Sequence, residues 1–580
     1  MNAATALAVV LADEFARCGV TNIVVAPGAR SGPLAQALFI QAAQSGQRLH
    51  TRFDERAAGF LALGLAKRSR RPVVVVCTSG TATANLHPAV LEASHSHLPL
   101  VVLTADRPPE MRGTGASQTT DQTKLFGSAV RLYTEVGTPC LERESTPSAN
   151  SYWRSLVCRA VASAASGPVH LNVPFPEPLD FTPADDADVR FPGRPAGKPW
   201  IEIEPAAPPT LSRCTVTVAA AARGVVVVGD DAEDPAAAAA FAEAVGWPLL
   251  AEPQSDARTG PNAITTYRYL LAHPATRARL MPEIVVSVGR PGISREVQAL
   301  LRDVDEIIVV DPHHDWADPT RSAHRVLRLL PTPEWPAADS SWLRLWRAAD
   351  QTAQRALDSF LDDSPYSEPR LVRDVLRQLP DDALCVIGSS MPIRDADVTM
   401  PQRRGLRVLC NRGLAGIDGT TSTAIGAAIA HQAAGGGNAY AIMGDLTFLH
   451  DLTGLVRGPG TAQPDLTIIV INNQGGGIFS LVGHTADALG FDTLFAAPHS
   501  VDIASLAAGA GWQHTAVTGP SELTASLSGG GPRIVEIRTD RHVNAKLHQR
   551  LSAHIGQALD VEGDRWRSRK LPRNNEARTA

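Results

Sequence analysis

Short runs of β-branched and other apolar residues recur along this chain, and segments with helical spacing of apolar residues separate them. In the N-terminal third these runs are Ile23–Ala26, Pro72–Cys77, Leu98–Thr104 and Val169–Val173. A strand buried on both faces forms a continuous apolar run, and parallel strands need crossover helices between them. This alternation predicts an α/β fold with doubly wound parallel sheets.

The same alternation returns twice more. The further predicted strands are residues 224–228, 284–288 and 307–310, and then 383–388, 439–443, 466–471 and 533–537. Stretches rich in Pro, Gly and Asp at 180–200 and 331–341 interrupt the pattern, as linkers do. We therefore predict three α/β domains, at 1–185, 200–335 and 355–555, and a polar tail without fixed structure at 556–580.

Composition excludes several classes of protein. A length of 580 residues accommodates three or four domains, and a net charge of −5 without long like-charge runs argues against a nucleic-acid partner. No apolar run approaches the length of a membrane span, and Asp13 and Glu14 stand where a signal peptide would be apolar. The seven cysteines are scattered without metal-site spacing. We expect a soluble, cytoplasmic protein.

Polar residues follow two neighbouring predicted strands of the third domain. Gly444-Asp445-Leu446 ends one strand, and Asn472-Asn473-Gln474-Gly475 ends the next. Because parallel strands bind ligands at their carboxyl edge, both turns are expected at one site. Mg²⁺ prefers oxygen ligands, which Asp445, the Asn473 amide and the Gly475 carbonyl provide. Each pair alone is more often an ordinary turn, but their spacing favours a metal-diphosphate site.

Together these turns resemble the diphosphate motif of thiamine-diphosphate enzymes, with Leu446 in place of the final glycine. Such enzymes need a buried Glu beside the cofactor's pyrimidine, and the resemblance assigns this role to Glu55 in Asp54-Glu55-Arg56. An acid that complements a helix N-terminus is the simpler interpretation of Glu55 taken alone. The resemblance also implies that thiamine diphosphate bridges two chains, in a homodimer or homotetramer with active sites between chains.

Six further segments extend the resemblance to the menaquinone-pathway family that joins 2-oxoglutarate to isochorismate. They are Ala26–Ser31, Thr104–Glu110, Gly115–Gln118, Ser390–Arg394, Asn411–Gly413 and Gly475–Ser480. This resemblance implies a transferase that decarboxylates 2-oxoglutarate and adds the succinyl carbanion to isochorismate by 1,4-addition. Its implied cofactors are thiamine diphosphate and Mg²⁺, with Mn²⁺ as a substitute.

The resemblance assigns the remaining site residues. Glu55 and Gln118 are expected to be catalytic, and Arg394 and Arg412 to bind the donor's distal carboxylate. Arg30 and Arg107 are expected to bind the acceptor, against an apolar wall of Ile478 and Phe479. The cofactor-binding residues are Glu55, Gly80, Thr81, Ser390, Ile417, Gly444, Leu446 and Thr447. Several arginines suit dicarboxylate substrates because the guanidinium fork matches a carboxylate.

Other interpretations stay open at this point. An acetolactate-synthase-like carboligase or decarboxylase would need a mostly apolar donor pocket, and a catalytically silent scaffold would not need Glu55 or Asp445. Ser117 and Ala29 depart from the family pattern, which puts hydrogen bonds at those positions in doubt. His95, His97 and the 313–315 segment are expected at the surface. Arg290 and Arg295 of the central domain could reach the pocket or an effector site.

Overall fold

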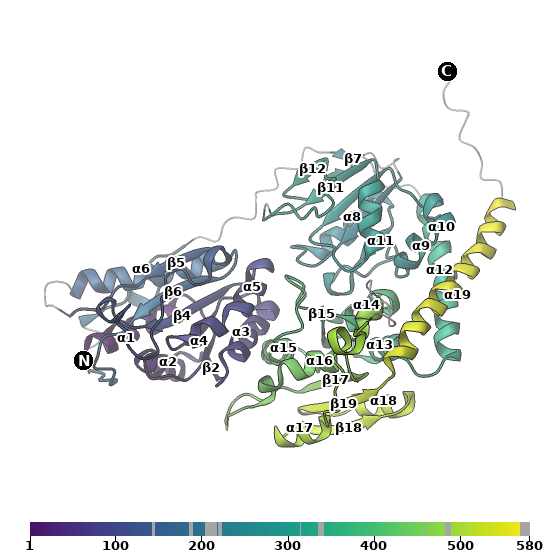
Figure 1. Ribbon diagram of the computed structural model, residues 1–580. Coiled ribbons are helices and arrows are strands. Elements are labelled where there is room, and N and C mark those ends of the chain that lie inside the picture. The colour runs from purple at the N-terminus through teal and green to yellow at the C-terminus, as the bar shows by residue number, and fades with distance from the viewer. Residues whose placement is uncertain are drawn as a thin grey trace.

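The computed structural model describes residues 1–141, 146–184, 190–203, 217–218, 223–313, 315–333, 341–458, 460–481 and 489–568. Its three main sheets contain six, five and six strands, and every paired strand in them is parallel (Figure 1). Buried apolar residues cover both faces of each sheet. The predicted fold class, with three doubly wound parallel sheets, is confirmed.

The first sheet has the strand order β2-β1-β3-β4-β6-β5. Its strands are β1 (Asn22–Val25), β2 (Arg48–Thr51), β3 (Val73–Cys77), β4 (Leu100–Asp106), β5 (Leu132–Glu135) and β6 (Val169–Pro174). The helices are α1 (Ala3–Arg17), α2 (Gly32–Ser45), α3 (Glu55–Ser69), α4 (Thr81–Asn85), α5 (His87–His95) and α6 (Thr146–Ala164). Every residue of β3 is buried, as its Val-Val-Val-Val-Cys sequence predicts.

The central sheet has the order β12-β11-β10-β8-β9. Its strands are β8 (Gly224–Val228), β9 (Leu249–Ala251), β10 (Ile284–Val288), β11 (Glu306–Val310) and β12 (Arg325–Leu327). Around it lie α8 (Pro235–Val245), α9 (Tyr267–Ala272), α10 (Pro274–Arg279), α11 (Arg295–Asp303) and α12 (Ser341–Asp363). A separate two-stranded ladder joins β7 (Thr217–Val218) to β13 (Thr332–Pro333).

The third sheet has the order β15-β14-β16-β17-β19-β18, which repeats the arrangement of the first sheet strand for strand. The strands are β14 (Leu384–Ile387), β15 (Arg407–Leu409), β16 (Ala439–Gly444), β17 (Leu466–Asn472), β18 (Gln513–Val517) and β19 (Arg533–Arg538). The helices are α13 (Glu368–Gln378), α14 (Met391–Thr399), α15 (Thr420–Ala433), α16 (Asp445–His450), α17 (Ile503–Gly509), α18 (Pro520–Leu527) and α19 (Arg541–Ser568).

Helices α3 and α15 join the first domain to the third through one shared hydrophobic core. Their backbones approach closely because glycines stand at the crossing. A Cβ on Gly64 would lie 2.1 Å from the carbonyl oxygen of Thr423, and one on Gly426 would lie 2.2 Å from that of Leu61. Since α3 begins at Glu55, this packing fixes where the proposed catalytic carboxyl lies.

The prediction of an unstructured tail from residue 556 is wrong for its first part. Helix α19 continues to Ser568 and runs beside α12 (Figure 1). Leu547, Leu551, Ile555 and Leu559 recur every four residues and are buried at 3% exposure or less, so this apolar stripe extends the helix past Gly556. The rest of the predicted tail, 569–580, lies outside the described residues.

The surface position predicted for His97 is also wrong. His95 and His313 are exposed, but His97 is buried where the first domain meets the central one. Its Nδ1 lies 2.5 Å from Asp231, its Nε2 lies 2.9 Å from Asp315, and its ring stacks on His313. His314 lies outside the described residues. In the described part of the chain, no helix has the length and apolar character needed to cross a membrane.

Candidate active site

A cavity of about 330 Å³ lies at the carboxyl edge of β14, β16 and β17. Turns and helix starts that follow these strands supply most of its walls, as the strand-end motifs predict. All of the third-domain residues predicted for the site line this one cavity: Ser390, Arg394, Arg412, Ile417, Gly444, Asp445, Leu446, Thr447, Asn473, Gly475, Ile478 and Phe479. The structure therefore brings the predicted metal, cofactor and donor groups of this domain together.

The oxygen atoms at the base of the cavity suit a divalent cation. Asp445 is buried, and one of its carboxylate oxygens accepts hydrogen bonds from the Gly475 N–H at 2.9 Å and from His499 at 3.1 Å. Burial raises the pKa of Asp445 above its usual value, so a nearby positive charge would stabilise its carboxylate form. The Asn473 Oδ1 is buried and has no hydrogen-bond partner among the described residues. An unpartnered amide oxygen beside a buried carboxylate fits a Mg²⁺ site.

Sequence reasoning missed Glu368, which orients this amide. Glu368 is 1% exposed, and its Oε1 accepts hydrogen bonds from Asn473 Nδ2 and from Thr539 Oγ1, both at 2.9 Å. Because Glu368 holds the amino group of the Asn473 side chain, the amide oxygen of Asn473 is directed to the cavity side. Burial, reinforced by the charge of Asp395, raises the pKa of Glu368 to about 7. Glu368 stands at the start of α13, far along the chain from either motif, and no local pattern marks it.

Backbone conformations around the cavity are unusual for their residue types. Ser390 has φ 77, Ala415 has φ 59 and Gln474 has φ 57, although none is a glycine. At Gly475, φ is 149, and a Cβ would lie 2.5 Å from the Ala496 carbonyl oxygen. Left-handed backbone at non-glycine residues is costly and concentrates at functional sites. At this cavity such a backbone would let peptide groups, rather than side chains, face a diphosphate.

Positive charges gather on one side of the cavity. Burial, followed by the charges of Arg412, Arg268 and Arg295, lowers the pKa of Arg394. A second cavity of about 950 Å³ shares Met391 and Arg394 with the first and is lined also by Arg268 and Arg295. Arginines that repel one another in this way form a site for anions. Arg295 lines the second cavity only, and Arg290 pairs with Asp230 at 3.2 Å.

The first-domain residues form a separate group at the carboxyl edge of the first sheet. Arg30 is buried and donates to the Phe175 carbonyl. Burial, followed by the charge of Arg30, lowers the pKa of Arg107. Arg107 donates a short hydrogen bond to Ser79 Oγ, and Gln118 Nε2 donates to the Ser79 carbonyl. Gln118 also has left-handed backbone, with φ 55. These contacts place Arg30, Arg107 and Gln118 in one polar cluster.

Gly80 ends the turn between β3 and α4, and Thr81 begins α4, beside this cluster. Gly80 has φ 81, its N–H donates to Gln122 Oε1 at 2.9 Å, and a Cβ there would lie 3.1 Å from Gln118 Cγ. Glu55 begins α3, but Asp54 is the residue whose side chain caps that helix, by accepting from the N–H groups of Arg56 and Ala57. Glu55 is itself an acidic residue of the first turn, where its charge complements the helix dipole, so the simpler interpretation of Glu55 also fits the structure. No described first-domain residue is among those that line the third-domain cavity.

Three family models match the chain in order. They are described as "Thiamine pyrophosphate enzyme, N-terminal TPP binding domain" (residues 1–125), "Middle domain of thiamine pyrophosphate" (195–386) and "Thiamine pyrophosphate enzyme, C-terminal TPP binding domain" (395–537). The two models for cofactor-binding domains match parts of the first and the third domain, whose sheets share one strand order.

Curated relatives match over nearly the full length. Proteins named 2-succinyl-5-enolpyruvyl-6-hydroxy-3-cyclohexene-1-carboxylate synthase are similar to this chain. The relative from Thermobifida fusca (strain YX) is 50% identical, over 96% of this chain and 100% of its own length. The one from Saccharopolyspora erythraea is 46% identical, with the same coverage. The one from Nocardioides sp. (strain ATCC BAA-499 / JS614) is 44% identical, over 95% of this chain and 98% of its own length.

Proposed function

Because the chain belongs to the family of thiamine-pyrophosphate-dependent 2-succinyl-5-enolpyruvyl-6-hydroxy-3-cyclohexene-1-carboxylate synthases, we propose that it forms this product from 2-oxoglutarate and isochorismate. The observation that carries the proposal is the arginine-lined cavity built around Asp445 and Asn473. It combines oxygen ligands for a metal-diphosphate group with cations for a dicarboxylate donor. The product belongs to menaquinone biosynthesis, and the reaction class is that of a transferase.

The third-domain residues hold the cofactor. Asp445, the Asn473 amide oxygen and the Gly475 carbonyl are the proposed ligands of Mg²⁺, for which Mn²⁺ is the expected substitute. The backbone of Ser390, Gly444, Leu446 and Thr447 faces the diphosphate, and Ile417 supports the cofactor from the cavity wall. Bound thiamine diphosphate supplies a carbon nucleophile that attacks the ketone of a 2-oxoacid and takes up the electron pair when CO₂ leaves.

Each remaining residue has a separate task in the proposal. The Glu55 carboxyl shares a proton with the ring nitrogen of the cofactor's pyrimidine, and Gly80 and Thr81 border that ring. Arg394 and Arg412 bind the donor's distal carboxylate, and Arg30 and Arg107 bind the acceptor. Gln118 would donate a hydrogen bond to the ketone oxygen of the donor. Ile478 and Phe479 exclude water and support the acceptor ring.

The catalytic unit is proposed to be a homodimer, or a homotetramer built from such dimers. Glu55 and Gln118 lie on the first domain, and no first-domain residue in the described part of the chain lines the cavity around Asp445. Exposed apolar side chains flank both groups: Phe53, at 57% exposure, precedes Glu55, and Leu414, at 51%, follows Arg412. Apolar residues left open beside incomplete sites favour a second copy that covers them. A cytoplasmic location stays a prediction.

The test is an assay of the purified protein with thiamine diphosphate, Mg²⁺, 2-oxoglutarate and isochorismate, in which the loss of isochorismate absorbance is followed. Glu55→Gln is the control, because it removes the carboxyl and preserves the side chain's size. Isochorismate loss that requires 2-oxoglutarate and is absent in the control would support the proposal. Release of CO₂ from pyruvate without use of 2-oxoglutarate would favour an acetolactate-synthase-like reaction instead.

A further inference from the structure

One short turn of the central domain contacts Arg412 of the first cavity and leads into Arg295 of the second cavity. The turn Gly292–Ser294 follows β10, and the Gly292 carbonyl accepts a hydrogen bond from Arg412 Nη2 at 3.4 Å. Ser294 caps α11 by accepting from the Val297 N–H, and Arg295, which lines the second cavity beside Arg394, is the first residue of that helix. The position of this turn therefore sets the positions of Arg295 and Arg412.

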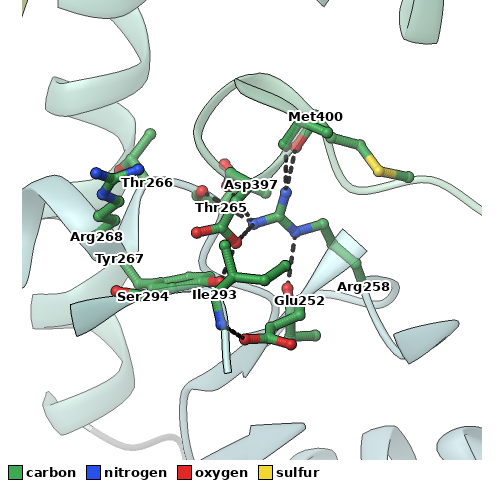
Figure 2. Close-up of polar contacts among 12 residues, drawn as sticks. Glu252, Arg258, Thr265, Thr266, Tyr267, Arg268, Ile293, Ser294, Asp397 and Met400 are labelled. Carbon is green, nitrogen blue, oxygen red and sulfur yellow. Dashed lines mark hydrogen bonds and ion pairs between the residues drawn. The ribbon is translucent and has the colours of Figure 1, made fainter. Parts of the chain in front are cut away.

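A buried carboxylate, Glu252, holds the turn. Glu252 follows β9 and is 4% exposed. Its Oε1 accepts hydrogen bonds from the backbone N–H groups of Gly292 at 2.8 Å and Ile293 at 2.7 Å, as Figure 2 shows for Ile293. Its Oε2 accepts from Gln254 Nε2 at 2.7 Å. Because one oxygen takes two successive N–H groups, the orientation of the turn is fixed, and neither donor has to be buried without a partner.

The charge of Glu252 is costly where it lies. Burial is the main cause that raises the pKa of Glu252 to about 7, the charge of Asp397 raises it further, and the charge of Arg412 is among the influences that lower it. A neutral side chain could accept the same two N–H groups without this cost. Of the arginines that repel one another around Arg394, Arg412 is the one whose charge acts on Glu252.

Arg258 provides the matching support for the helix that carries Arg394. Its guanidinium is 2% exposed and donates to the carbonyls of Asp397 and Met400 at the end of α14, at 2.7 and 3.1 Å (Figure 2). It also lies 3.7 Å from the Asp397 carboxylate, which accepts a short hydrogen bond from Tyr267. Arg258 thus fixes α14 against the central domain, beside the Gly292–Ser294 turn that Glu252 holds.

We propose that Glu252 is a positioning residue of the donor pocket, which holds the Gly292–Ser294 turn so that Arg412 and Arg295 face the same carboxylate as Arg394. The inference rests on the proposed function, since it assumes that these arginines bind the donor. Glu252 lines neither cavity, so it acts through the turn and does not touch the substrate. The central domain, which carries none of the strand-end motifs, then takes part in donor recognition.

The test compares Glu252→Ala with Glu252→Gln. The alanine variant loses both hydrogen bonds, and we expect its KM for 2-oxoglutarate to rise about 10-fold or more. Its kcat, its KM for isochorismate and its affinity for thiamine diphosphate should stay within about twofold. Glu252→Gln should restore most of the donor KM, because its amide oxygen accepts the same N–H groups. Its amino group replaces the oxygen that accepts from Gln254 Nε2, and a flip of the Gln254 amide turns the unpartnered Oε1 toward it.

Asp350→Asn is the matched control. Asp350 is also buried in the central domain, and one of its oxygens likewise accepts two successive N–H groups, from Thr265 and Thr266. Among the described residues, this acid makes no hydrogen bond or ion pair with the turn or with Arg394 and Arg412, so its replacement should lower the melting temperature and leave the donor KM unchanged. If Glu252→Ala does not fold, Glu252→Asp replaces it, because the shorter side chain retains the charge and cannot reach both N–H groups.

The possible results distinguish a failure of the Glu252 positioning role from a failure of the proposed function. A wild-type enzyme that uses both substrates, together with an unchanged donor KM in Glu252→Ala, would refute the positioning role alone. An equal rise of the donor KM in Asp350→Asn would also refute it, because any loss of a buried acid would then have the same effect. A wild-type protein that does not turn over 2-oxoglutarate with isochorismate would refute the proposed function and, with it, this inference.

Discussion

Replacement of Arg394 by alanine should selectively reduce the use of donors with a distal carboxylate. Arg394 lies where the two cavities meet, and its Nη1 donates to the Ser390 carbonyl, which leaves the rest of the guanidinium fork for a ligand. The charges of Arg412, Arg268 and Arg295 contribute to its lowered pKa, so an anion between these arginines relieves their repulsion. The interaction that is lost is therefore a charge-assisted hydrogen bond in a partly buried site.

The size of the effect follows from that interaction. A hydrogen bond to a charged group contributes about 1.5–3 kcal/mol, which corresponds to a fall in kcat/KM for 2-oxoglutarate of about 10- to 150-fold. For 2-oxobutanoate, which has no distal carboxylate, kcat/KM should change by less than about threefold. The ratio of the two values is the measured quantity, and it cancels any general loss of active enzyme.

Arg394→Lys serves as the control for charge without the planar fork. It should lose less of the ratio than Arg394→Ala, because an ammonium group still attracts the carboxylate but cannot bind it with two parallel hydrogen bonds. A ratio in Arg394→Ala equal to that of the wild type would refute the assignment of this arginine to the donor. An equal fall for both donors would point instead to damage of the cofactor site.

Three further predictions concern the metal, the interdomain core and a buried acid. Glu368→Ala should raise the Mg²⁺ concentration needed for half-maximal activity by about 10- to 100-fold, because the Asn473 amide loses its partner. Glu368→Gln should raise this concentration less, and equal values for the two variants would contradict the orienting role of Glu368. Gly64→Ala should destabilise the protein by about 1–3 kcal/mol or more in thermal unfolding. Gly509→Ala is the control, because a Cβ there meets nothing within 4 Å. Similar melting temperatures for the two variants would contradict the close crossing of α3 and α15. Burial raises the pKa of Asp451 from 3.8 to about 6, so the folded state holds this proton more tightly and stability falls as pH rises through that window. Between pH 4 and pH 6, the free energy of unfolding measured with denaturant should fall by about 3 kcal/mol less in Asp451→Asn than in the wild type. The same dependence on pH in both proteins would contradict this prediction.

The sequence predicts the interior strands of each sheet and misses every strand at a sheet edge. The missed strands are β2, β5, β9, β12, β15 and β18, which end the three sheets. Interior strands are buried on both faces and form apolar runs, such as Val73–Cys77. Edge strands have one neighbour and carry mixed residues, as in β18, where Gln513, Thr515 and Ala516 are exposed. The continuous apolar run that predicts a strand is therefore weakest in the edge strands.

The candidate site divides in a similar way. Asp445 and Asn473 could be located from sequence because the turns that carry them follow adjacent strands of one sheet. Glu368, His499 and Glu252 could not, because each reaches its partner from a different element, and a lone acid or histidine has no local signature. His97 was misplaced for the same reason, since both of its carboxylate partners belong to another domain.

In the proposed dimer, each active site joins Glu55 of one chain to Asp445 of another. Mixing inactive Glu55→Gln and Asp445→Asn chains, after unfolding and refolding together, distinguishes this arrangement from sites within one chain. If sites lie between chains, each mixed dimer contains one site with neither substitution, and random pairing should restore about one quarter of the wild-type activity. If both residues act within one chain, every site carries a defect, and a mixture as inactive as its two components would contradict the account.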